Sequence, residues 1–266
     1  MTAQQIWHDL EALRQQTPLV HNITNFVVMN NTANALLSLG ASPVMAHAPE
    51  EVEEMVAIAD ALVINIGTLS RNWVSAMELA MMAAATKGIP IVFDPVGVGA
   101  TAFRRSTCQR LLEGAVPAVI RGNASEIMAL VDVASRTRGV DSLASAQDAQ
   151  TAAVALARRY ACVVVVSGAV DLITDGTQLV HLANGHPLMP RVTGLGCTAS
   201  ALVGAFAAVR GDALAAATAA MAVMGICGEL AAERAAGPGS LQMHLLDHLY
   251  RLDLEQLSGR LRLTSG

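Results

Sequence analysis

Short runs of apolar, largely β-branched residues alternate along this chain with stretches of helical character. Four of the runs predict strands that are buried on both faces of a sheet: ALVINIG at 61–67, IPIVFDPVG at 89–97, AVIRGN at 118–123 and CVVVVSG at 162–168. Helices are expected at 49–59, 73–86, 125–131 and 145–160. This order predicts a three-layer α/β/α fold with a mostly parallel central sheet, in which ligands bind at the carboxyl ends of the strands.

The alternation changes in two places. Residues 171–175 and 178–182 flank an Asp-Gly turn, which predicts a hairpin and therefore an antiparallel edge of the sheet. Beyond Pro190, a glycine-containing loop at 194–196 leads into three Ala-rich helices, so the C-terminal third is expected to be helical apart from its loops. We expect a single domain over 1–266, because no linker-like segment divides a chain of this length.

Charge and cysteine usage exclude several classes of function. The net charge is −5 and no cluster of Lys and Arg is longer than two residues, which argues against a nucleic-acid partner. The four cysteines form no CxxC pair, which argues against a zinc site or a disulfide framework and favours a cytoplasmic protein. The first residues lack the pattern of a secretory signal. The apolar segment 213–232 contains Glu229 and consists mainly of Ala, so it predicts a buried or interface helix and no membrane span.

Carboxylates and a cation follow two of the predicted strands. Asp94 directly follows the strand expected at 89–93, and Arg121, Asn123 and Glu126 lie together at the end of the next one. Hard oxygen ligands beside a cation are what a magnesium and phosphate site requires. Two plainer interpretations stay open: Asp94 satisfies N–H groups of its own turn, and Glu126 completes a helix N-terminus.

The segment from Thr193 to Thr198 predicts an anion site. Gly194 and Gly196 allow successive backbone N–H groups to converge, and the helix expected at 199–209 adds its positive end. The same residues match a relaxed dinucleotide fingerprint, but no strand is predicted directly before them. Cys197 lies where a helix N-terminus favours the thiolate. It is otherwise a small buried residue, or a nucleophile partnered by a histidine.

Amide and hydroxyl side chains crowd the segment 18–25, before a helix expected to start near Phe26. This density predicts a recognition pocket for a neutral polar ligand that includes Asn25, although Thr24 or Asn25 is also a candidate N-cap. Met45 follows the short apolar run 42–44 and is either an apolar wall of that pocket or part of the core.

Several of these segments together resemble the hydroxyethylthiazole kinases of thiamin biosynthesis and salvage. The resemblance runs in order over nearly the whole chain: PLVHNITN (18–25), ALLSLGASPVMAHAPEE (35–51), DPVGVGA (94–100), IRGNASEI (120–127), GLGC (194–197) and GPGS (237–240). Two positions depart from the family's commoner pattern. Leu195 replaces the Thr of GTGC, and Ser167 replaces a Thr at the end of its strand.

The resemblance implies a ribokinase-like fold and a homotrimer with active sites near subunit boundaries. It implies transfer of the γ-phosphoryl group of ATP to the primary alcohol of 4-methyl-5-(2-hydroxyethyl)thiazole. The resemblance also assigns roles by position. Asp94 and Glu126 would hold Mg²⁺, and Arg121, Asn123 and Ser167 would bind ATP. Asn25, Met45 and Gly194 would bind the thiazole, with Gly67 and Thr68 from a neighbouring subunit, while Gly194 and Gly196 would hold the migrating phosphoryl group and Cys197 would act as a base or orienting group.

Three other functions remain to be separated from this one. A kinase of the same fold acting on hydroxymethylpyrimidine would show ADP production with that alcohol. A non-catalytic thiazole- or nucleotide-binding regulator would bind without ADP production. A dinucleotide oxidoreductase would bind a nicotinamide cofactor.

Overall fold

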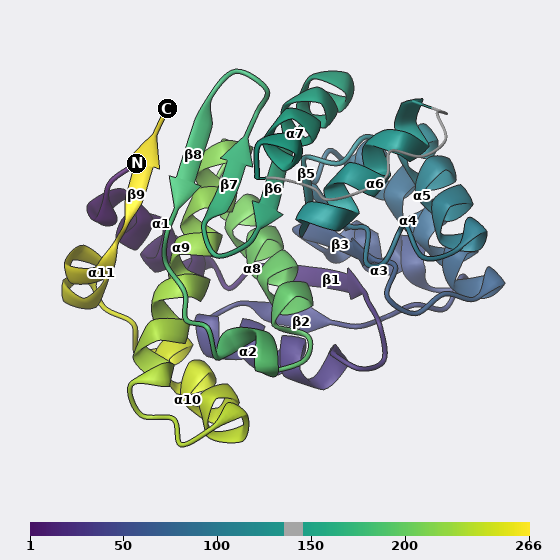
Figure 1. Cartoon of the computed structure of the whole chain (residues 1–266). Helices are drawn as coiled ribbons and strands as arrows, with labels where there is room; N and C mark the ends of the chain where they lie inside the picture. Colours follow the sequence, from purple (N-terminus) through teal and green to yellow (C-terminus); the bar gives the residue numbers. More distant parts are fainter. Residues whose placement is uncertain (136–145) are drawn as a thin grey trace.

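The central feature of the computed structural model, which describes residues 1–135 and 146–266, is a mixed sheet. Its nine strands have the order β2-β1-β3-β4-β5-β6-β7-β8-β9 (Figure 1). The strands from β2 to β6 pair in parallel, whereas β7, β8 and β9 each pair antiparallel with the strand before them. The bounds are β1 Leu19–Ile23, β2 Ser42–Val44, β3 Ala61–Asn65, β4 Ile91–Asp94, β5 Val119–Asn123, β6 Val163–Ser167, β7 Asp171–Thr174, β8 Leu179–Leu182 and β9 Leu263–Ser265.

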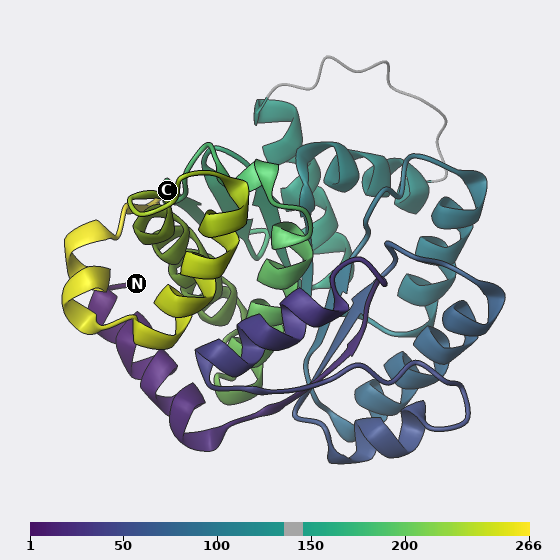
Figure 2. The ribbon, with the colours of Figure 1, turned by 90° about the horizontal axis from the view of Figure 1, so that it is seen from below.

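Helices cover both faces of the sheet and make it the middle of three layers (Figure 2). One layer contains α3 Val52–Ile58, α4 Arg71–Lys87, α5 Ala102–Gly114, α6 Ala124–Ser135 and α7 Ala146–Tyr160. The other contains α1 Ala3–Gln16, α2 Met29–Leu39, α8 Leu195–Val209, α9 Ala213–Ala232, α10 Pro238–Arg251 and α11 Leu254–Arg260. A single 3₁₀ turn, η1 Met189–Arg191, precedes α8.

The middle of each parallel strand is largely apolar because alternate side chains pack into the cores on opposite faces of the sheet. In β3, Leu62 and Ile64 pack with α3 to α7, whereas Val63 packs with the layer that contains α8. Each such side chain contributes roughly 1.5–3 kcal/mol when it is fully buried. Gly204 brings α8 close to the sheet, since a Cβ there would lie 2.7 Å from Cγ2 of Val63. This contact fixes the height of α8 above the strands, and with it the position of the helix N-terminus.

The four predicted parallel strands, the helices between them and the hairpin are confirmed. Residue 145, the expected start of α7, lies outside the described residues. The prediction of an all-helical C-terminal third is wrong, because β9 extends the sheet there and α11 adds a fourth helix. Helix α8 starts at Leu195 and not at 199, and α2 starts at Met29 with Val28 as its N-cap, so neither Thr24 nor Asn25 caps it. Helices α1 and α5 were not predicted.

Helix α9 is long and apolar enough to cross a membrane by length and composition alone. Most of its most apolar window, 83%, is buried inside the fold. Its buried side chains belong to the same core as α1, α8 and α10. The expectation of a buried helix is therefore confirmed, and α9 is a central helix of its layer.

Candidate active site

Polar side chains end four neighbouring parallel strands. Asn65 of β3 is in register with Asp94 of β4, and Asn123 of β5 is in register with Ser167 of β6. Because parallel strands finish at one edge of the sheet, these groups share a single rim. The structure thus brings together the strand-end residues that the sequence identified, and adds Asn65 to them.

Asp94 is completely buried beneath this rim. Its Oδ2 atom accepts hydrogen bonds from Nδ2 of Asn65 at 2.8 Å and from Oγ of Ser200 at 2.7 Å. Its Oδ1 atom has no hydrogen-bond partner in the part of the chain that the structure describes. Burial raises the pKa of the Asp94 carboxyl to about 6, against the opposing effect of the nearby Arg121 cation. A buried carboxyl oxygen without a partner is a ready acceptor for a ligand.

Asn25 links the same network to the first turn of α8. Its Nδ2 atom donates to Oδ1 of Asn65 at 3.0 Å and lies 3.4 Å from Sγ of Cys197. Gly67 packs directly on this amide, since a Cβ at position 67 would lie 2.6 Å from Nδ2 of Asn25. Asn25, Gly67 and Cys197 are thereby gathered at one point within a single chain.

The thiol of Cys197 is a poor base in this setting. Burial raises its pKa to about 11, and the Asp94 carboxylate adds to the rise. The expectation that the helix N-terminus favours the thiolate is therefore wrong, because desolvation and a neighbouring negative charge outweigh the helix dipole. At neutral pH the thiol keeps its proton and serves as a small polar group.

The anion site predicted at 194–196 is the N-terminus of α8. Gly194 is the N-cap with φ of 82°, and a Cβ there would lie 2.3 Å from Cγ1 of Val28, so only glycine fits. No side chain in the described part of the chain caps this helix. The first amides of a helix have no partners inside it, and here they coincide with the positive end of the helix dipole. An anion is the natural partner for such a group of donors.

Arg121 faces these amides from β5. It is 8% exposed, and its Nη2 atom donates to Oγ of Ser167 at 2.7 Å. Its Nη1 atom lies against the backbone of Gly196, where an added Cβ would be 2.7 Å away. The Nε atom of Arg121 has no partner among the described residues. The guanidinium and the helix end thus point two positive groups at one small region.

A cavity of about 750 Å³ opens in front of Arg121. Its lining comes from four parts of the chain: the ends of β5 and β6 with the start of β7, the segment between β8 and α8, the first turns of α8, and α9. Among the predicted residues it includes Arg121, Asn123, Ser167, Gly194 and Gly196. This volume suits a small organic ligand.

Glu126 mainly performs the structural role that was left open for it. Its Oε2 atom accepts from the backbone N–H of Asn123 at 2.9 Å, while Oδ1 of Asn123 accepts from the N–H of Glu126, which is a capping box. Its Oε1 atom accepts from the N–H of Gly97 at 2.9 Å. Glu126 therefore joins the loop after β4 to the start of α6.

Asp94 and Glu126 fit a magnesium ion that is held partly by the protein and partly by substrate phosphates and water. Among the described residues, no three His, Cys, Asp or Glu side chains gather into a complete metal site. Mg²⁺, however, is commonly held by one or two carboxylates together with substrate phosphates and water. The unpartnered Oδ1 atom of Asp94 and the free lone pairs of Glu126 fit that pattern.

Comparison with known proteins identifies the chain. Residues 10–255 match the model of the hydroxyethylthiazole kinase family. The chain belongs to this family. A hydroxyethylthiazole kinase from Syntrophus aciditrophicus is 58% identical over 100% of this chain and 99% of its own length. One from the Miyazaki F strain of Nitratidesulfovibrio vulgaris is 56% identical over 97% of this chain and 96% of its own.

Solved structures agree with this assignment. The hydroxyethylthiazole kinase protein from Pyrococcus horikoshii OT3 is 45% identical, has a TM-score of 0.92, and is matched over 99% of both chains. The pyridoxal kinase of Staphylococcus aureus, solved with AMP-PCP, has a TM-score of 0.63 at 17% identity over 78% of this chain and 86% of its own. At that identity it shows the fold alone, which is ribokinase-like as expected.

The family assignment makes this chain a kinase that acts on an alcohol. The dinucleotide interpretation of 194–199 fails, because the segment before it contains the 3₁₀ turn η1 and no strand. Met45 and Thr68 are half-buried, and their predicted contact with the thiazole stays a prediction. In this kinase Gly67 lies against Asn25 of its own chain, and its approach to a neighbouring subunit likewise stays a prediction.

Three residues of the site were not found from the sequence. Asn65 and Ser200 bind Asp94, and Arg104 holds two loops of the rim. Its Nη1 atom donates to the carbonyls of Ile66 at 2.5 Å and Val96 at 2.7 Å, and Nη2 donates to that of Gly67 at 2.8 Å. Asn65 gave one signal, as a polar residue inside an apolar run; Ser200 and Arg104 gave none.

Proposed function

We propose that this kinase transfers the γ-phosphoryl group of ATP to the primary alcohol of 4-methyl-5-(2-hydroxyethyl)thiazole at the N-terminus of α8. The single observation that carries the location is the juxtaposition of Arg121 with the uncapped amides of 195–197 at the mouth of the cavity. The family assignment carries the reaction. At this rim a buried cation, a helix N-terminus and a buried carboxylate lie together.

ATP occupies the 750 Å³ cavity with its phosphates toward Arg121 and Ser167. The alcohol lies on the other side of the turn, near Asn25, Met45 and Cys197. Its oxygen forms a bond to the γ-phosphorus as the bond from that phosphorus to the β–γ bridging oxygen breaks, and ADP leaves. The proton of the alcohol departs late and passes to water or to an oxygen of the transferred phosphoryl group, because the transition state of phosphoryl transfer is loose.

Electrostatics supplies most of the rate in this scheme. The amides of α8 and the Arg121 guanidinium stabilise the negative charge on the equatorial oxygens of the phosphoryl group. Cys197, with its proton in place, orients the alcohol and does not act as the base. Mg²⁺ held by Asp94 and Glu126 would supply further positive charge beside the phosphates.

We propose a homotrimer whose boundaries lie beside the alcohol site. Two apolar side chains directly after Asn25 are largely exposed, Phe26 at 64% and Val27 at 66%. The Phe26 ring contacts Trp73, with ring centroids 4.9 Å apart. Such a patch is suited to burial by another subunit.

Light scattering should give three times the chain mass for the wild type and a lower mass for Phe26→Asp. Val116→Asp is the control, because Val116 is also largely exposed, at 56%, and precedes β5 at the opposite end of the strands.

We also propose that the enzyme acts in the cytoplasm as one domain. All four cysteines, Cys108, Cys162, Cys197 and Cys227, are free, which suits a reducing compartment. The described strands belong to one sheet, which supports one folding unit.

An ADP-release assay tests the reaction. Hydroxyethylthiazole, hydroxymethylpyrimidine and pyridoxal are compared at equal concentration with ATP, with Mg²⁺ or with EDTA. We expect ADP production with hydroxyethylthiazole and Mg²⁺, and a strong loss with Arg121→Ala. Faster turnover of the pyrimidine alcohol, or tight thiazole binding without ADP, would replace the proposal with one of the alternatives.

A further inference from the structure

One wall of the cavity does not belong to the strand ends. It is formed by the segment that follows β8, from Asn184 to Pro190, together with Met221, Met224 and Gly225 of α9. This segment contains only the short turn η1, so its own backbone hydrogen bonds define its shape weakly. Something outside it must hold it in place.

Helix α9 packs closely against this wall at two of its glycines. A Cβ at Gly225 would lie 2.8 Å from Cβ and 2.9 Å from the carbonyl carbon of Asn184. A Cβ at Gly228 would lie 2.3 Å from Sδ of Met189. The two glycines therefore let the wall lie directly on the helix.

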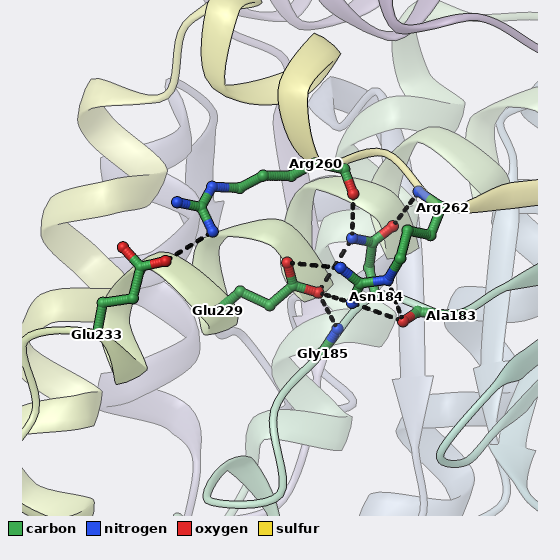
Figure 3. Close-up of polar contacts among 7 residues, drawn as sticks. All are labelled: Ala183, Asn184, Gly185, Glu229, Glu233, Arg260 and Arg262. Atoms are coloured by element: carbon green, nitrogen blue, oxygen red, sulfur yellow. Dashed lines mark hydrogen bonds and ion pairs between the residues drawn. The ribbon is translucent and has the colours of Figure 1, made fainter.

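Glu229, the single charged residue of α9, binds the wall near Gly225, where Asn184 packs on the helix (Figure 3). Its Oε1 atom accepts from the backbone N–H of Gly185 at 2.8 Å and from Nδ2 of Asn184 at 3.0 Å. Gly185 has φ of 132°, a left-handed conformation that needs to be held by its surroundings. One carboxylate oxygen thus fixes two consecutive residues that line the cavity.

Arg262, just before β9, completes this arrangement. Its guanidinium pairs with both carboxylate oxygens of Glu229, and its Nε and Nη2 atoms donate to the carbonyl of Ala183. Its backbone N–H donates to Oδ1 of Asn184 at 2.9 Å. Glu229 is only 9% exposed, and an unpaired charge at that depth is costly. Arg262 therefore supplies the opposite charge that a carboxylate at this depth requires while it binds the wall.

We propose that Glu229 is a positioning residue for the nucleotide site. It holds Asn184 and Gly185 in the shape that receives ATP, with Arg262 as its counterion, and it touches no reacting atom itself. This inference rests on the proposed function, specifically on ATP occupying the cavity that Arg121 and Ser167 line.

Glu229→Ala and Glu229→Gln test the proposal. We expect Glu229→Ala to raise KM for ATP, and the dissociation constant of ADP measured by calorimetry, by about tenfold. KM for the thiazole and kcat at saturating ATP should change less than about twofold. Glu229→Gln keeps an oxygen for Gly185 and should have a smaller effect of the same kind.

The chain offers a matched control one turn away. Glu233 also lies at the end of α9 and pairs with Arg260 at 2.7 Å, but it makes no contact with the wall (Figure 3). Glu233→Gln should leave all three kinetic constants unchanged. Gly225→Ala disturbs the wall by displacing Asn184 without touching the ion pair, and it should raise KM for ATP as Glu229→Ala does.

The outcomes separate the two proposals. If Arg121→Ala raises KM for ATP and Glu229→Ala does not, ATP is in the cavity and the role of Glu229 is overturned. If neither variant affects ATP while the wild type is active, the nucleotide lies elsewhere and the proposed function of the cavity fails. If kcat falls and KM rises equally for ATP and for the thiazole, the fold is generally damaged and the inference is also overturned.

Discussion

Arg121 and Gly196 share one space: the guanidinium of Arg121 lies where the side chain of any other residue at position 196 would begin. The distance from Nη1 to an ideal Cβ there is 2.7 Å, which no real contact allows. Arg121 is held on its other side by Ser167, so moving away from position 196 would break that hydrogen bond. The helix N-terminus and the cation are therefore brought together by the absence of a side chain.

Gly196→Ala should accordingly displace Arg121 from the phosphate region. We expect kcat/KM for ATP to fall by at least about tenfold, because a cation that stabilises the transferring group is misplaced. Steady-state kinetics measures the loss. Gly239→Ala is the matched control, since Gly239 is likewise the second residue of its helix and has nothing within 4 Å. Equal behaviour of the two variants would contradict the role of this contact.

Three substitutions should show how much each of three side chains of the site contributes to catalysis. Cys197→Ser should lower kcat by less than about tenfold, because the thiol is protonated and only orients the alcohol. Asp94→Asn and Arg121→Ala should each lower kcat/KM by more than about a hundredfold, because they remove charges that act on the phosphates. Steady-state kinetics that gave the opposite ranking would return Cys197 to the role of base.

Asp94 should make the free protein less stable as pH rises. Its pKa is raised to about 6 in the fold, above the value of 3.8 for an unperturbed carboxyl, so the folded state holds the proton more tightly. The stability it contributes is complete below about pH 3.8 and is lost as pH rises through about 6. Urea unfolding of wild type and Asp94→Asn at pH 4.5 and 7.5 should show the variant gaining roughly 1–3 kcal/mol relative to wild type. A difference that does not change with pH would refute this.

Arg104 should matter for alcohol binding although it lies behind the rim. Its planar fork binds three carbonyls on two loops, which a lysine cannot reproduce. We expect Arg104→Lys to raise KM for the thiazole about three- to tenfold through the loop at 66–68, and to lower Tm by a few degrees. Arg105→Lys is the control, since the guanidinium of Arg105 binds the exposed carbonyl of Gly99 and no second carbonyl among the described residues. If thermal melts and kinetics do not distinguish the two, the loops are held by other contacts.

The sequence predicted those parts of the fold that short-range patterns determine. The strands of the parallel sheet are buried on both faces, so their apolar runs are continuous, and the hairpin carries its Asp-Gly turn. Strand β9 has three residues and no such pattern. It forms because β8 offers a free edge, which only the assembled sheet reveals.

The same limit applies within the site. Arg121, Asp94 and the glycines of 194–196 stand at points where local sequence dictates a strand end or a helix start. Asn65 and Ser200 belong to the site only because they lie next to Asp94 in space. Along the chain they are 29 and 106 residues away from it. The pKa of Cys197 was misjudged for a related reason, because burial depends on everything that packs around the thiol.

The bond between Arg262 and Asn184 joins residues 78 positions apart and has a consequence for biosynthesis. The parallel strands and α9 leave the ribosome first, while Arg262 is still inside the exit tunnel. A nascent chain at that stage has a buried carboxylate without its counterion and a loosely held loop. The loop beside α9 is therefore held less firmly until Arg262 has emerged and paired with Glu229.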